Sequence, residues 1–290
     1  VDAPLISVPG VPVDTTIVAE QPISEYRPGF FQKIQFTPYW IMGGNSPDAL
    51  GLTGFDFRGV FGVPFFTVKS PLMITPGFGM HFIDWQGVPS LPSKVYDSYI
   101  EFKHLRMLTE HLGMDVGIQF GAYGDYLHDN TQTFRITGHG YGAWIVSERL
   151  KYILGVEYLN RDDIRMLPIG GVLWQPNDDW RFEIFFPKPK FARRIIWPLT
   201  PDALTTDWLY VAGELGGGTW AIWRDDSVAD TMTNRDYRIL LGIERKTLGY
   251  QRPDIGFEVG YVFSRSLEFT SGIPNANPTD SLMLRCFLVY

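Results

Sequence analysis

The sequence lacks features on which several classes of protein depend. Its one cysteine, Cys286, excludes an internal disulfide and any metal site built from several cysteines. With 25 Lys and Arg against 32 Asp and Glu the net charge is −7, which argues against a nucleic-acid partner. No apolar stretch approaches the ~18–20 residues that a transmembrane helix needs. This absence does not exclude a membrane protein built from strands, because barrel strands are only ~9–11 residues long and alternate in polarity.

Signatures of catalysis are missing as well. His139 lies in the glycine-rich segment 135–142, yet neither His-x-Ser nor a Gly-x-Ser-x-Gly turn occurs, so a hydrolase would lack its nucleophile–base pair. The segment 216–218 is no phosphate loop, since no Gly-Lys-Ser/Thr follows, and we expect it to permit a bend in a long strand. The five histidines show no zinc spacing. The sequence therefore predicts no enzyme, no cofactor and no metal site.

The sequence is rich instead in alternation between apolar and polar residues. A period of two is typical of a strand, because successive side chains point to opposite faces. From Phe31 onward such segments recur between turn signals, and no window shows a sustained helical period. We expect fourteen strands, or twelve if 165–174 and 190–197 are not strands. The segments are 31–42, 51–61, 72–84, 95–106, 113–126, 133–147, 150–160, 165–174, 179–187, 190–197, 207–223, 236–247, 255–269 and 281–290.

The residues that alternate favour a membrane barrel over a soluble sandwich or lectin-like barrel. The apolar faces often end in Tyr or Trp, as girdles at the membrane interface require, and the opposite faces mix both signs of charge. Strands of soluble sandwiches are also shorter, around 5–6 residues. We therefore predict an all-β fold, a closed antiparallel transmembrane β-barrel. The expected interface aromatics are Tyr96, Tyr126, Trp144, Tyr152, Tyr158, Trp180, Tyr237 and Tyr290.

The polar faces supply the residues expected to line the lumen. They are Glu101, Lys103, Gln119, Arg135, His139, Tyr141, Glu157, Arg181, Glu183, Glu214, Arg238, Glu244, Glu258 and Arg285. One interpretation is a polar path or small-molecule site, since rings of charged side chains set selectivity. The other is a paired Arg/Glu network that fills a narrow barrel, which the near balance of signs favours, because unpaired like charges would be costly there. We expect His139 to be structural.

Residues 1–29 differ from the rest of the chain. Three prolines in the first twelve residues predict an extended tail, and the barrel is expected to span 30–290. Within the tail, residues 14–20 resemble the short box by which energised transporters engage a periplasmic coupling protein, although the chain has no room for the plug domain of those transporters. A plain tail, folded into the barrel mouth, is the favoured interpretation. The start at Val1 rather than Met fits a mature form after cleavage, or equally an arbitrary start.

The end of the chain carries a resemblance. Residues 281–290 alternate and finish on Tyr290, which resembles bacterial outer-membrane β-barrel proteins, whose last strand closes the barrel and carries the assembly signal. Segments 260–269 and 280–290 also resemble an uncharacterised barrel family of planctomycete-type bacteria, from which no activity carries over. The resemblance implies an outer-membrane location with both termini in the periplasm. The longer polar connections, among them 224–235 and 271–280, would then face outward.

The expected function is passive passage or binding of small solutes through the charge-lined lumen. A closed structural barrel that anchors a partner or the cell envelope is the alternative, and an outer-membrane hydrolase ranks third. The expected partners are outer-membrane lipid and a periplasmic or envelope protein that binds residues 1–29.

Overall fold

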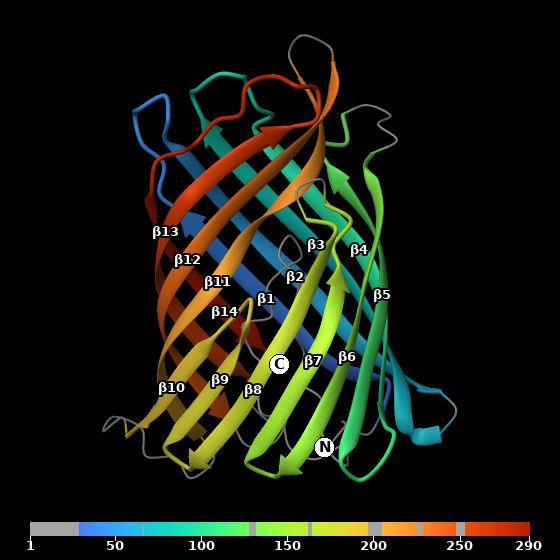
Figure 1. The fold of residues 1–290 in the computed structure, drawn as a ribbon. Coiled ribbons are helices and arrows are strands. Elements are labelled where there is room, and N and C mark those ends of the chain that lie inside the picture. Colours follow the sequence, from blue (N-terminus) through green and yellow to red (C-terminus); the bar gives the residue numbers. More distant parts are fainter. Residues whose placement is uncertain are drawn as a thin grey trace.

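The computed structural model describes residues 29–65, 67–127, 132–161, 164–196, 205–224, 228–247 and 253–290. These residues form fourteen strands (Figure 1). The strands are β1 (Phe31–Ile41), β2 (Leu50–Phe65), β3 (Thr67–Trp85), β4 (Lys94–Met107), β5 (Leu112–Gly124), β6 (Phe134–Ser147), β7 (Leu150–Tyr158), β8 (Met166–Asn177), β9 (Trp180–Phe186), β10 (Lys190–Ile195), β11 (Thr205–Trp223), β12 (Ala229–Thr247), β13 (Asp254–Phe269) and β14 (Ser281–Val289). Within the described residues, no helix is long and apolar enough to cross a membrane.

Each strand pairs in antiparallel fashion with the next, and β1 pairs with β14, so the sheet closes on itself. In the closing pair Phe36 lies opposite Leu288 and Tyr39 opposite Arg285. The predicted closed antiparallel barrel of fourteen strands is therefore confirmed. The two segments on which the count depended are strands, β8 and β10. The tail at 1–28, with its expected partner, lies outside the described residues.

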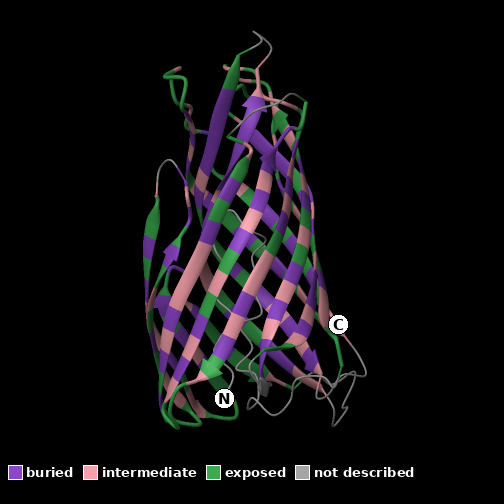
Figure 2. Ribbon diagram, turned by 90° about the vertical axis from the view of Figure 1, so that its right-hand side faces the viewer, coloured by how far each residue is buried: buried purple, intermediate pink, exposed green. Residues whose placement is uncertain are grey.

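The two faces of the wall differ in polarity as alternation predicts. Exposed and buried residues alternate along most of the strands (Figure 2). The exceptions are 214–222 of β11 and 230–234 of β12, where nearly every residue is buried. In β14, Leu282, Leu284 and Leu288 are exposed, whereas Met283 and Arg285 are buried. A closed barrel turns alternate side chains inward and outward, so the apolar set faces out and most of the ionisable set faces in.

Strand β12 begins seven residues earlier than the expected 236, so the prediction of a loop over 224–235 is wrong from Ala229 onward. Residues 229–235 are mostly polar, which is why the sequence favours a loop there. In the structure Asn234 lies opposite Gly218 of β11 and Leu267 of β13. Ladders on both sides, together with buried polar partners, outweigh the low strand propensity of these residues.

Strand β11 changes neighbours along its length. Its pairing with β10 runs from Asp207 to Ala212, yet the strand continues to Trp223, and there Ala221 pairs in parallel with Gly124 of β5. The Asp125 amide donates to the Ala221 carbonyl at 3.1 Å. Between the two contacts lies Gly217, at the expected bend, with φ of +102°. Glycine adopts this conformation readily, whereas other residues are strained in it.

Candidate functional site

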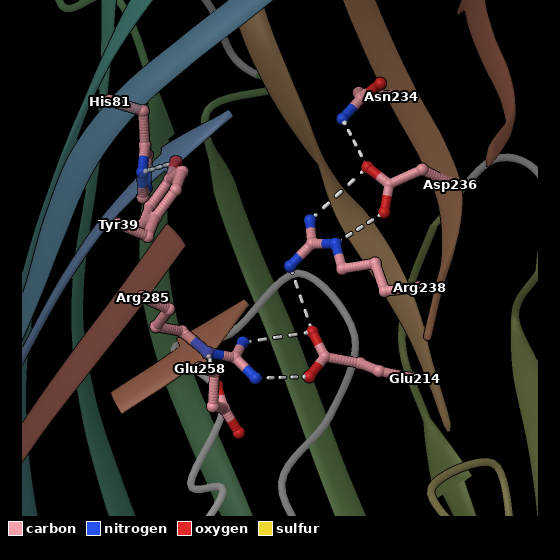
Figure 3. A network of polar contacts seen from close by, with 8 residues as sticks. All are labelled: Tyr39, His81, Glu214, Asn234, Asp236, Arg238, Glu258 and Arg285. Atoms are coloured by element: carbon pink, nitrogen blue, oxygen red, sulfur yellow. Dashed lines mark hydrogen bonds and ion pairs between the residues drawn. The ribbon is translucent and has the colours of Figure 1, made fainter. Parts of the chain in front are cut away.

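A network of ion pairs occupies the inner face of β11 to β14 (Figure 3). Glu214 of β11 accepts from Arg238 of β12 (Nη1–Oε1, 2.9 Å) and from Arg285 of β14 (Nη2–Oε2, 2.9 Å). Arg285 Nε also donates to Glu258 of β13. Two strands separate β11 from β14, so the contact between Glu214 and Arg285 joins elements that do not pair in the sheet. Glu214 thus holds two guanidinium groups at once.

The same network continues upward along β12. Arg238 Nε lies 2.6 Å from Asp236 Oδ1, and Asn234 Nδ2 donates to Asp236 Oδ2 at 3.4 Å (Figure 3). At the other end of the network, Glu258, which accepts from Arg285, also accepts from the Tyr210 hydroxyl through Oε1 at 2.6 Å. Charge-assisted hydrogen bonds of this kind are stronger than neutral ones, and buried ions need them because they have lost their water.

A second cluster gathers cations around one carboxylate. Lys190 Nζ lies 2.7 Å from Glu244 Oε2, while Lys246 Nζ and Arg181 Nη1 lie 3.7 and 3.8 Å from Glu244 Oε1. The Arg181 guanidinium stacks 4.4 Å from the Trp208 ring centroid, a cation–π contact. Glu183 lies opposite Lys190, so three cations face two carboxylates and this part of the inner face has an excess of positive charge.

A third cluster places one histidine among carboxylates. His139 Nε2 lies 3.0 Å from Asp115 Oδ1, and Nδ1 lies 3.8 Å from Glu101 Oε1, on the other side of the ring. The ring stacks on Tyr141 at 4.7 Å, and Tyr141 donates to Glu157. This part of the inner face is acidic, and a structural role for His139 stays a prediction.

The expected lumen residues divide among these clusters. Twelve of the fourteen are less than a tenth exposed, while Glu101 and His139 are half-buried. The structure brings together Glu214, Arg238, Glu258 and Arg285, then Arg181 and Glu244, then Glu101, His139, Tyr141 and Glu157. Of the remaining four, Gln119 donates to the Tyr123 hydroxyl, and Lys103, Arg135 and Glu183 are buried.

Sequence reasoning missed several ionisable residues of the inner face. Asp56, His81 and Asp97 come from β2, β3 and β4, and one ligand atom of each lies within 4.8 Å of the others. Spacings of 25 and 16 residues match no metal signature. Only the register of three strands brings these residues together, and the alternation pattern does not contain that register.

Part of the inner face is apolar, which the sequence did not predict. Buried side chains of β6 to β9 form one cluster there. Its members are Tyr141, Ala143, Ile153, Leu159, Leu167, Ile169, Leu173 and Phe185. The inner face of these strands is therefore mixed, because His139, Glu157 and Arg181 lie on it beside the apolar cluster.

Seven of the eight expected interface aromatics lie near an end of a strand, whereas Tyr237 lies midway along β12. Trp144 lies opposite Tyr152 beside the turn between β6 and β7, and Tyr158 ends β7 at its other end. Tyr96 and Tyr126 stack with ring centroids 5.4 Å apart. Seven of the eight are exposed, and Tyr96 is half-buried. Their position at a membrane interface stays a prediction.

No protein-family model matches the sequence, and no curated protein matches it. Among solved structures the chain is similar to an outer membrane channel from Pseudomonas putida F1, at 13% identity and TM-score 0.40, over 93% of this chain and 99% of that one. It is also similar to a bacterial polysaccharide outer membrane secretin, at 9% identity and TM-score 0.42, over 89% and 97%. The third is OprD from Pseudomonas aeruginosa, at 10% identity and TM-score 0.31, over 93% and 97%. The resemblance to a planctomycete-type family stays a prediction.

Proposed function

We propose that the chain is a bacterial outer-membrane β-barrel that binds or passes small polar solutes through its charged interior. One observation carries this proposal, the reversal of polarity across a closed wall. Leu154, Ile239 and Leu241 are among many large apolar side chains exposed on the outside, while Glu244, Glu258 and Arg285 are buried inside. Monomeric soluble proteins rarely expose so large an apolar surface, whereas bilayer lipid would cover it.

The outer aromatics support the membrane location. Trp144, Tyr152 and Trp180 lie near the short turns, and Tyr126 and Tyr158 near the opposite ends of their strands. Their rings combine an apolar body with a polar group, which suits the level of the lipid headgroups. Two such groups, one towards each end, would mark the two interfaces of a bilayer.

The inner clusters support selection by charge. The basic cluster at Glu244 and the acidic cluster at His139 lie on different strands, so a solute inside would meet both signs of charge. A zwitterion, or a polar solute with separated charges, fits such an interior better than a simple anion or cation does. Charged side chains around a passage set its selectivity in this way.

The test is conductance of the purified, detergent-extracted chain in a planar bilayer. We expect repeatable steps, and opposite shifts of reversal potential for Glu101→Gln and Arg181→Gln, because each removes one sign of charge. Leu154→Ile, on the outer face, is the matched control and should leave the potential unchanged. If neither Glu101→Gln nor Arg181→Gln shifts the reversal potential, selection by these clusters is overturned.

A closed structural barrel is the second candidate, and the contact between Arg285 and Glu214 favours it. Paired side chains that reach past two strands fill space that a solute would need. A folded protein that stays silent in the bilayer would support this candidate. Deleting residues 1–29 should then disrupt a complex in the cell envelope and leave permeability unchanged.

A further inference from the structure

Asp56, His81 and Asp97 lie around one glycine on the inner face. Asp56 of β2 lies opposite Gly79 of β3, and Gly79 lies opposite Asp97 of β4. The three residues thus form a row across three neighbouring strands, with the two carboxyl groups flanking the position that has no side chain. His81 follows Gly79 by two residues, so its side chain points to the same face.

The missing side chain at Gly79 leaves the room into which these groups point. A Cβ atom at Gly79 would lie 2.6 Å from Asp56 Oδ1 and 3.1 Å from His81 Nε2. Both atoms therefore approach the same point above the glycine. Asp97 Oδ2 lies 3.1 Å from His81 Nε2, a separation that two ligands of one metal ion also have, since each bonds at about 2.0–2.2 Å.

Outer hydrogen bonds already fix two of the three side chains. Trp220 of β11 donates to Asp97 Oδ1 at 2.7 Å, while the partner of Asp97 Oδ2 is His81 Nε2, the other proposed ligand. The Tyr39 hydroxyl lies 2.8 Å from His81 Nδ1 (Figure 3). A histidine that binds metal through Nε2 carries its proton on Nδ1 and donates it to such an oxygen.

Asp56 supplies the independent observation. The residue is only 8% exposed, and its Oδ1 atom is buried without a hydrogen-bond partner among the described residues. A buried carboxylate oxygen without a partner is costly, and a bound cation removes that cost. All three side chains line one cavity of about 60 Å³, enough for an ion and a water molecule.

The two arginines that line the same cavity are engaged elsewhere. Arg238 pairs with Asp236 and Glu214, and Arg285 pairs with Glu214 and Glu258. The described contacts of neither arginine include a hydrogen bond to Asp56 or Asp97. The two carboxylates and the histidine thus keep their capacity for a cation.

We propose that Asp56, His81 and Asp97 bind a divalent transition-metal ion of the Zn²⁺ or Mn²⁺ kind. One imidazole with two carboxylates suits these ions, whereas Ca²⁺ and Mg²⁺ prefer oxygen ligands alone. Water completes the coordination from the cavity. The site is additional to the passage of solutes and would exist in an open or a closed barrel.

The test is calorimetric titration of the full, tag-free chain in detergent after removal of metal with a chelator. With Zn²⁺ we expect one saturable site per chain that excess Mg²⁺ does not occupy. Asp56→Asn and His81→Asn should each weaken it about tenfold or more, since even outer partners of metal ligands contribute that much. Gly79→Ala should weaken it too, because the added methyl group occupies the space above the glycine.

His139→Asn is the matched control. It removes a histidine that also lies between two carboxylates, but these contact opposite ring nitrogens and cannot share one ion with it. Folding of each variant is checked by heat-modifiable gel mobility. With Co²⁺ as probe, ligand-field absorption should appear in wild type and in His139→Asn and vanish in His81→Asn. No saturable site in wild type, or equal affinity in the folded Asp56→Asn and His81→Asn variants, would overturn the proposal.

Discussion

The inner face of the barrel has two parts that are stabilised in different ways. The charged wall is the network of Glu214, Arg238, Glu258 and Arg285 on β11 to β14. These strands also bury apolar residues elsewhere along their length. The apolar wall is the hydrophobic cluster on β6 to β9 that includes Ile169 and Phe185. The charged residues of these strands, such as Glu157 and Arg181, belong to the other clusters. Each ion of the charged wall depends on named partners, whereas the apolar wall depends on filled volume. One closed sheet thus combines specific ion pairs with non-directional apolar packing. Substitutions in the two walls should distinguish the two contributions to stability.

The largest effect is expected where one ion serves two partners. Arg285→Gln leaves Glu258 and one oxygen of Glu214 without their charged donor, so we expect a loss of about 3–5 kcal/mol in the free energy of unfolding. Urea unfolding in detergent or lipid measures it. Arg149→Gln, in the exposed pair with Asp178, is the control and should cost less than about 1 kcal/mol. Equal losses in the two variants would remove the distinction between buried and exposed pairs.

The apolar wall should respond to lost volume alone. Ile169→Ala opens a cavity in the cluster, and we expect a loss of about 2–5 kcal/mol, as large-to-small core substitutions give. Ion preference in a planar bilayer should stay unchanged, because no charge is altered. A shift in reversal potential as large as that of Arg181→Gln would show that the apolar wall takes part in selection.

The outer side of the apolar wall gives a smaller effect that depends on lipid. Leu154 is 76% exposed, and its neighbour Ile153, only 3% exposed, points inward. Leu154→Arg should cost about 2–4 kcal/mol in a bilayer if the residue lies near its midplane. Unfolding from lipid vesicles measures the loss. A variant as stable as wild type in vesicles would contradict a lipid-facing outer surface.

The fold was predictable because the period of two survives in almost every segment. Leu284 and Arg285 fall on opposite faces whatever the register, and the turn signals give the strand count. The early start of β12 could not be predicted, since Thr233 and Asn234 form a strand only through neighbours on both sides.

The site was predictable as single residues and not as contacts. Glu214 lies directly opposite Arg238, and Glu258 opposite Arg285, so a correct register would have given both pairs. The contact between Glu214 and Arg285 needs in addition the curvature of the closed sheet. To predict the row of Asp56, Gly79 and Asp97, the register of two strand pairs must be known. The apolar wall was missed because the residues expected on the inward faces were chosen for their polarity, which left out aliphatic ones such as Ile153.

The meeting of Ala221 with Gly124 gives the barrel two perimeters. At the level of β9 and β10 the ring contains all fourteen strands. At the contact between Ala221 and Gly124 the ring closes through nine strands, β1 to β5 and β11 to β14. Because barrel diameter grows roughly in proportion to strand number, the ring there is roughly two-thirds as wide. The interior therefore tapers, and Trp220, next to Ala221, lies at its narrow end beside Asp97. Within the described residues, the number of strands in the ring therefore sets the width of the interior at that end.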